Sequence, residues 1–195
     1  ARQTIGCRQP DRAAVLALHE IWSSWLWLYD QQGQVHAEKI LAVMRYASQE
    51  LGVKHFILDS LMKCGMAEDD YTAQKTFIDA LCTIARDTGM HIHLVAHSRK
   101  ARDETQAPGK MDVKGSGAIT DQVDNVVIWW RNKAKENAIQ AGEPSDPSKP
   151  DALMLIDKQR NGEFEGKVGF WFEPGSLQYV ESANRIPMDM LRRRA

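Results

Sequence analysis

The chain has 195 residues and a mass of 22.1 kDa, of which 43% are hydrophobic and 26% charged, a balance that favours one globular domain over residues 1–195 and excludes a disordered or fibrous chain. Lys and Arg total 25 against 26 Asp and Glu, so the net charge of −1 excludes a general attraction to polyanions, and a nucleic-acid site would have to be local. The apolar runs are too short for a membrane helix and no signal-like segment opens the chain, so we expect a cytoplasmic protein without membrane contact, whose cysteines Cys7, Cys64 and Cys82 are reduced and structural.

The first half of the chain alternates between strand-like apolar runs and apolar residues at helical spacing. The expected elements are a strand at 26–29, a helix at 35–51, a strand at 55–60, a helix around 77–85 that stops near Gly89, and a strand at 91–97. Strands joined by helices long enough to cross over imply a parallel sheet with helices on both faces. The expected fold class is α/β.

The second half begins with a long polar segment, 98–121, whose length alone marks it as a functional loop. The elements expected after it are a strand at 125–131, a polar linker at 133–150, a strand at 153–157, and a closing hairpin with strands at 168–172 and 177–180. We expect these last strands to form an antiparallel edge. The basic tail, 185–195, is expected to be a flexible, solvated end.

Two polar side chains end neighbouring predicted strands. Asp59 follows one apolar run and His97 follows the next, and the carboxyl ends of parallel strands are where ligands gather in an open sheet. A carboxylate there can hold Mg²⁺ that bridges nucleotide phosphates, although an aspartate after a strand also serves as a cap or turn residue, and His97 as a half-buried histidine bonded to the backbone. His91 and His93 share a strand face but lack a third metal ligand in the sequence.

The polar segment carries a local excess of two positive charges, because five basic and three acidic side chains fall between Ser98 and Gly117. Glycine lets backbone amides approach an anion, and lysine supplies a point charge, so the segment could contact phosphate groups. A solvated loop is the alternative. Further along, Lys158 and Arg160 follow a strand and would project together. Such an arginine can stabilise a transferring phosphoryl group, and the alternative is an ordinary surface pair.

Four segments, taken in order, resemble the later motifs of the RecA-like motor domain of DnaB-type replicative DNA helicases. They are H-F-I-L-D-S at 55–60, H-L-V-A-H-S-R-K at 93–100, D-V-K-G-S-G-A-I-T-D-Q-V-D-N-V-V at 112–127 and D-K-Q-R-N-G-E-F-E-G at 157–166. The chain is most similar to the phage helicase-primase and Twinkle branch, over about 26–180. The resemblance implies a RecA-like three-layer sandwich, with a parallel central sheet and antiparallel edge strands near the C-terminus.

The resemblance also implies an ATP-driven motor that translocates on single-stranded DNA and unwinds duplex as a ring, expected to be a hexamer. Asp59, beside Ser60, would be the Walker B carboxylate that holds Mg²⁺ with ATP or another nucleoside triphosphate. His97 would sense the γ-phosphate. Lys158 and Arg160 would reach the ATP site of the neighbouring copy, Arg160 as an arginine finger. Arg131 and Phe172 would contact the nucleotide base, and the residues implied in DNA binding are Arg99, Lys100, Arg102, Lys114, Gly115, Ser116 and Gly117.

The chain departs from this family in one respect. A P-loop of the form G-x-x-x-x-G-K-[ST] is absent from the 195 residues, so the chain resembles a motor domain entered partway, and we expect it to hydrolyse ATP poorly or not at all by itself. The longer protein, of bacterial, phage or prophage context, would work with a primase or a primase domain. Two alternatives remain: a RecA-like ATPase that regulates or binds DNA without unwinding, and a binding module without enzymatic activity.

Overall fold

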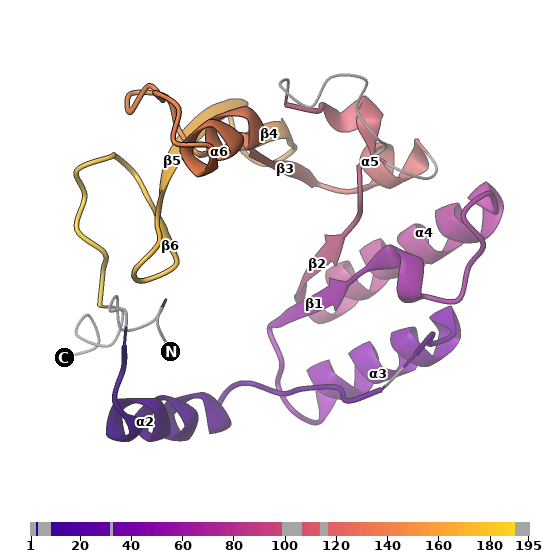
Figure 1. The fold of residues 1–195 in the computed structure, drawn as a ribbon. Coiled ribbons are helices and arrows are strands. Elements are labelled where there is room, and N and C mark those ends of the chain that lie inside the picture. The colour runs from indigo at the N-terminus through magenta and orange to yellow at the C-terminus, as the bar shows by residue number, and fades with distance from the viewer. Residues whose placement is uncertain (1–2, 4–8, 32, 99–106, 114–116, 190–195) are drawn as a thin grey trace.

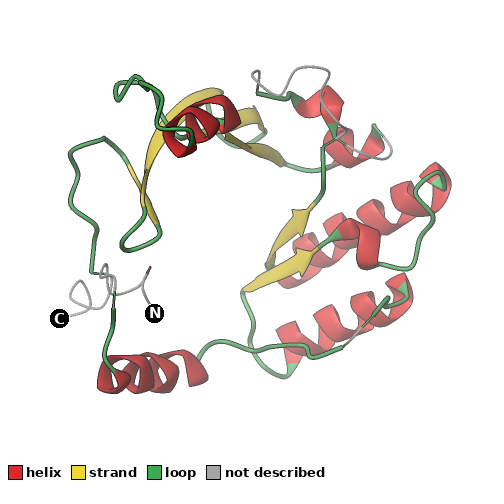
Figure 2. Cartoon of the chain, viewed as in Figure 1, coloured by secondary structure: helices red, strands yellow, loops and turns green. Residues whose placement is uncertain are grey.

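Figures 1 and 2 show the computed structural model, which describes residues 3, 9–31, 33–98, 107–113 and 117–189. The elements in chain order are α2 (Arg12–Ser23), α3 (Ala37–Gln49), β1 (His55–Asp59), η1 (Leu61–Lys63), α4 (Tyr71–Thr88), β2 (His91–Val95), η2 (Lys110–Asp112), α5 (Ala118–Gln122), β3 (Asn125–Arg131), α6 (Lys133–Gln140), β4 (Ala152–Gln159), β5 (Gly166–Glu173) and β6 (Gln178–Val180). Within these residues the strands form two sheets, one of β1 and β2 and one in the order β3-β4-β5-β6.

Helix α4 connects the two parallel strands, and residues next to its two ends determine where it begins and where it stops. The carboxylate of Asp70 accepts a hydrogen bond from the Ala73 amide at 2.9 Å, which satisfies one of the unpaired donors of the first turn. The helix ends at Gly89, whose φ of 66° is the left-handed conformation that a glycine adopts without steric cost. The predicted helix and its predicted end near Gly89 are therefore confirmed.

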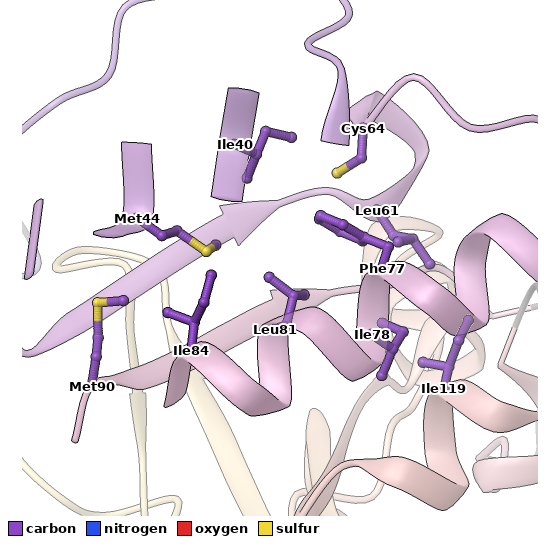
Figure 3. Packing of buried hydrophobic residues seen from close by; sticks show 10 residues of the cluster. All are labelled: Ile40, Met44, Leu61, Cys64, Phe77, Ile78, Leu81, Ile84, Met90 and Ile119. Atoms are coloured by element: carbon purple, nitrogen blue, oxygen red, sulfur yellow. The ribbon is translucent and has the colours of Figure 1, made fainter. Parts of the chain in front are cut away.

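The main hydrophobic core lies between α3, α4 and one face of β1 and β2. Figure 3 shows side chains of α3 and α4 directed toward one another, and Met44 and Ile78 are both completely buried. Phe56 and Leu58 of β1 pack against this cluster, as do the inward side chains of β2. The core thus holds the strand that ends in Asp59 against a long helix.

Cys64 belongs to the same core and has no exposed surface. Burial raises the pKa of its thiol to about 11, so the neutral form persists at physiological pH. Cys64 and Cys82 are both free thiols in this structure, and Cys7 lies outside the described part of the chain.

The parallel strands are covered on one face only within the described residues, contrary to the expectation of helices on both faces. Ile57 is 69% exposed and Val95 36% exposed on the opposite side. Exposed and partly buried residues alternate regularly along each strand. This alternation arises because successive side chains of a strand point to opposite faces of the sheet. The outward side chains of the two strands are His55, Ile57, Asp59, His91, His93 and Val95.

The second sheet is antiparallel throughout. Arg131 pairs with Ala152 of β4, which pairs in turn with Phe170 of β5, and the hairpin to β6 closes through Gly175 and Ser176 as predicted. The sequence therefore predicted the parallel and antiparallel parts of an α/β fold correctly. Among the described residues they form two sheets, where one continuous sheet was expected.

Three local predictions were wrong. Residues 26–29 form no strand: their side chains are exposed and the Leu26 amide donates to the carbonyl of Trp22 instead of to a neighbouring strand. An apolar run with no neighbouring strand cannot form the backbone hydrogen bonds of a sheet. The linker 133–150 contains α6, and the loop 98–121 contains η2 and α5. Helix α6 is mostly polar, so apolar spacing does not reveal it, although its Ala, Lys, Glu and Gln are good helix formers.

Candidate nucleotide and DNA site

Asp59 and His97 lie at the same edge of the parallel pair. Asp59 is the last residue of β1 and stands opposite Val95, the last residue of β2, so His97 follows two residues beyond that edge. Within the described residues the Asp59 carboxylate makes no hydrogen bond or ion pair, and it is exposed. Ser60 is buried at the start of η1, where its carbonyl accepts a hydrogen bond from the Lys63 amide at 2.9 Å. The parallel register thus brings the two strand ends to one edge, as predicted, although β2 ends at Val95 and not at the predicted His97.

The DNA-binding prediction falls largely outside the described residues, because these do not include Arg99, Lys100, Arg102, Lys114, Gly115 and Ser116. Of that set the structure describes Gly117, which directly precedes α5. Ser98 forms an isolated antiparallel bridge with Val113. The bridge places η2 beside the residues that follow β2, and so connects the end of the segment predicted to bind DNA to the edge that carries His97.

Lys158 and Arg160 reach the same part of their own chain. The Lys158 ammonium donates hydrogen bonds to the carbonyl oxygens of Thr120 at 2.9 Å and Asp121 at 2.7 Å, near the C-terminal end of the short helix α5. Helix carbonyls near a C-terminus are unpaired and carry partial negative charge, so a cation is stabilised there. In this structure Lys158 is therefore turned toward its own chain. The sequence analysis expected it to point outward, toward another copy.

Arg160 is held by Asp124, a residue that the sequence analysis did not single out. Its Nη1 lies 2.8 Å from Asp124 Oδ1, and its backbone amide donates to the Asp124 carbonyl at 2.9 Å. Both side chains remain about half exposed, at 51% and 53%. An ion pair this exposed is weak, so the guanidinium is accessible and releasable. The pairing spans 36 residues, and no local pattern in the sequence marks it.

Arg131 and Phe172 lie on one face of the antiparallel sheet. Arg131 is in register with Phe170 through β4, and Phe172 is two residues further along β5, on the same side. The Arg131 guanidinium makes two hydrogen bonds of 2.7 Å to Glu136, in the first turn of α6. Phe172 is 39% exposed, and its ring centre lies 5.2 Å from that of Tyr179, with the two ring planes tilted by 50°. A planar cation and an aromatic ring are thus both presented on this face.

Three histidines gather on the outward face of the parallel strands. His55 Nδ1 lies 3.2 Å from His93 Nε2, and the rings of His91 and His93 are 4.3 Å apart. The sequence placed His91 and His93 on one face, whereas His55 joins them only through the parallel register. In the residues that the structure describes, no group of three or more His, Cys, Asp or Glu is arranged to hold a metal ion.

Acidification is expected to destabilise the fold through His93. Partial desolvation, which His93 retains on this outward face, lowers its pKa below the ordinary value of 6.5, and the nearby His91 and His55 lower it further. The unfolded chain then binds a proton at a pH where the folded chain does not. The stabilisation from neutral His93 is therefore fully present above about pH 6.5 and is lost as the pH falls below it.

The measurement is thermal unfolding between about pH 7.5 and about pH 5.5. The His93→Gln variant is expected to lose less stability over this range than the wild type. His19→Gln, on α2 and away from the three histidines, should follow the wild type. An identical pH dependence for His93→Gln and the wild type would show that His93 does not contribute.

The described residues contain no helix long and apolar enough to span a bilayer.

Comparison with known proteins identifies relatives of the chain. A family model described as the DnaB-like helicase C terminal domain matches residues 8–181. Over 115 residues the chain is 29% identical to a DNA helicase/primase of Enterobacteria phage T3, an alignment that covers 54% of this chain and 20% of that protein.

A solved structure of a DnaB-like replicative helicase, determined with its interactions with primase, matches with a TM-score of 0.66 at 17% identity. It covers 92% of this chain and 47% of the other, and it confirms the RecA-type α/β fold. The chain therefore spans less than half the length of both relatives. Since the family model extends over most of the sequence, the chain belongs to the DnaB-like helicase C-terminal domain family.

Proposed function

We propose that this chain is the motor domain of an ATP-driven replicative DNA helicase, which translocates on single-stranded DNA and unwinds duplex as a hexameric ring. The observation that carries the proposal is the position of Asp59 and His97 at one edge of parallel strands in a chain of the DnaB-like family. Ligands of open α/β sheets bind at this edge. The helicase relatives support a motor, and the unwinding and the ring are what the experiment below tests.

The residues at this edge fit a nucleoside triphosphate with Mg²⁺. Magnesium keeps several water ligands and usually takes only one or two carboxylates besides the phosphate oxygens, and Asp59 offers an exposed carboxylate without a partner among the described residues. Bound Mg²⁺ would neutralise charge on the phosphates. Asp59 would orient the ion, and His97, beyond the adjacent strand, would respond to the γ-phosphate through hydrogen bonding.

The face with Arg131 and Phe172 fits the base of the nucleotide. Phe172 presents a half-exposed ring, and Glu136 holds the Arg131 guanidinium by two hydrogen bonds. Rings and guanidinium planes both stack on bases and tolerate any base identity. These two residues would therefore position the nucleotide with little preference among bases.

Single-stranded DNA would bind along the basic segment 98–117, mainly through backbone phosphates. Aromatic side chains are absent between Arg99 and Gly117, which disfavours base stacking as the main contact. Contacts to phosphates carry no sequence information. Binding should therefore be independent of sequence.

Assembly into a ring would bring Arg160 to the nucleotide of the neighbouring copy. Arg160 is half exposed, and its pair with Asp124 is weak enough to exchange for a phosphate. We also propose a primase domain or a primase as a partner, because one relative is named as a helicase/primase and the other was studied with primase.

The test is ATP-dependent displacement of a labelled strand from a forked DNA duplex by the full-length protein. We expect displacement to require Mg²⁺, and Asp59→Asn to reduce ATP hydrolysis on the order of 10²-fold or more, because loss of the metal's contribution is worth several kcal/mol. Asp146→Asn, on the loop before β4, is the matched control and should behave as the wild type.

The other outcomes separate the alternatives. ATP hydrolysis by the full-length protein without strand displacement would favour a RecA-like ATPase with a regulatory or DNA-binding role. A complete absence of hydrolysis would favour a binding module and contradict the proposal.

A further inference from the structure

Asp157 occupies an irregular position in the pairing of β3 with β4. Val126 pairs with Lys158 and Val127 pairs with Ile156, so Asp157 is an extra residue on β4 without a partner opposite. A β-bulge of this kind turns a side chain out of the regular alternation, and bulges are frequent next to functional sites. The direction of the Asp157 side chain is thus set by the bulge.

The carboxylate of Asp157 contacts a turn, residues 109–112, that is held together by its own hydrogen bonds. Asp157 Oδ2 accepts a hydrogen bond from the backbone amide of Lys110, the first residue of η2. Within the turn, the Gly109 amide donates to Asp112 Oδ2 at 2.8 Å, and the Asp112 amide donates to the Gly109 carbonyl at 2.9 Å. Because these bonds already fix the turn, Asp157 anchors it as a unit.

Two residues that follow Asp157 contact the chain just beyond the basic segment. Lys158 bonds to the end of α5, and Arg160 pairs with Asp124. The end of β4 therefore contacts the chain both before and after the residues 114–116. Asp157, Lys158 and Arg160 thus attach this strand end to the chain on both sides of residues 114–116, at η2 and around the end of α5.

We propose that Asp157 is a positioning residue that anchors the turn 109–112 to the end of β4, and thereby couples the binding of single-stranded DNA to the placement of Arg160 at a neighbouring nucleotide. The inference rests on the proposed function, since it concerns the DNA and nucleotide sites of the same motor. Asp157 touches neither ligand. It acts through the turn on one side and through Lys158 and Arg160 on the other.

Coupling of this kind is reciprocal. If bound nucleotide fixes Arg160 and with it the end of β4, the affinity for DNA changes, and bound DNA changes the affinity for nucleotide by the same factor. The measurable quantity is the ratio of two dissociation constants for a labelled oligonucleotide, determined with and without a non-hydrolysable ATP analogue. General loss of stability affects both constants alike and leaves their ratio unchanged.

The experiment uses the full-length protein and fluorescence anisotropy. For the wild type we expect a ratio in the usual range for allosteric coupling, about 5-fold to 150-fold. Asp157→Ala removes the acceptor and is expected to lower the ratio to about 1. Asp157→Asn keeps an oxygen acceptor of the same size and should restore most of the coupling.

A second pair of variants tests the same contact from the other side, in case Asp157→Ala does not fold. Lys110→Pro removes the amide donor, and proline is tolerated at the first position of a helical turn. The preceding Gly109 is extended, at φ −110° and ψ −179°, as a residue before proline requires. Lys110→Ala removes the same charge, and with it the same contribution to DNA affinity, but keeps the amide, so it is the matched control for Lys110→Pro. Its affinity for DNA is expected to fall as in Lys110→Pro, while its ratio of dissociation constants should equal that of the wild type.

The outcomes distinguish this inference from the proposed function. If Lys110→Pro and Asp157→Ala both have a lower ratio of dissociation constants than the wild type, by a similar factor, the inference is supported. If both variants have the same ratio as the wild type, the inference is overturned while the helicase function stands. A wild type that binds no DNA, or binds it regardless of nucleotide, would contradict the proposed function and this inference with it.

Discussion

Replacing Arg160 with alanine in the full-length protein is expected to reduce ATP turnover by about 10³-fold to 10⁵-fold while ATP binding is largely retained. An arginine that meets the charge of a transferring phosphoryl group contributes about this factor, which corresponds to roughly 4 to 7 kcal/mol of transition-state stabilisation. The measurement is steady-state ATP hydrolysis together with the equilibrium binding of a labelled nucleotide.

The structure allows this loss to be separated from unfolding. The Arg160–Asp124 pair is half exposed on both sides, so its removal should cost little stability. Arg185→Ala is the matched control, because Arg185 is also an exposed arginine in an ion pair, with Glu181 at 2.6 Å. We expect this variant to hydrolyse ATP like the wild type and to unfold at the same temperature.

Mixtures of wild-type and Arg160→Ala chains give the sharper result. If Arg160 acts on the nucleotide of a neighbouring copy, one variant chain disables a site that belongs to another chain. Turnover should then fall more steeply than the fraction of variant in the mixture. A loss in direct proportion to that fraction would contradict action between copies.

The parts of the fold that the sequence predicted are those where neighbours in the chain determine the structure. The helix ending at Gly89 shows its apolar spacing and its terminal glycine directly, and the strands that end at Asp59 and at Val95, two residues before His97, appear as short apolar runs. Since a crossover helix implies parallel strands, the shared edge of these two residues followed as well. That part of the site is encoded locally.

The remainder of the site depends on contacts between distant residues. Asp124 and Arg160 are 36 positions apart, Lys110 and Asp157 are 47 apart, and no spacing rule links them. The bulge at Asp157 depends on the register of two strands, which alternation of side chains does not specify to the single residue. For the same reason Lys158 was expected to project outward and instead bonds to α5.

The strand that was wrongly predicted at 26–29 shows what apolar composition cannot predict. Apolar composition describes what a strand needs for burial, whereas a strand also needs an edge with which to pair. In this structure Leu28 is 83% exposed, so neither requirement is met among the described residues. Composition alone cannot distinguish a paired strand from an unpaired apolar run.

Phe77→Ala is expected to lower the free energy of unfolding by about 3 to 5 kcal/mol, the usual cost of removing a buried aromatic ring. Phe77 is 3% exposed in α4, and it packs in the core that supports the strand ending in Asp59 (Figure 3). Such a loss is a large part of the roughly 5 to 15 kcal/mol of a typical domain. Urea denaturation measures it.

Phe164→Ala is the matched control for this change, because Phe164 is 55% exposed and surface substitutions usually change stability by about 0.5 kcal/mol or less. The difference between the two variants isolates burial from the chemistry of the substitution. Since α4 links β1 to β2, weakening its contact with them should loosen the edge that carries Asp59 and His97 together. Equal stability of the two variants would show that this core does not hold the site in place.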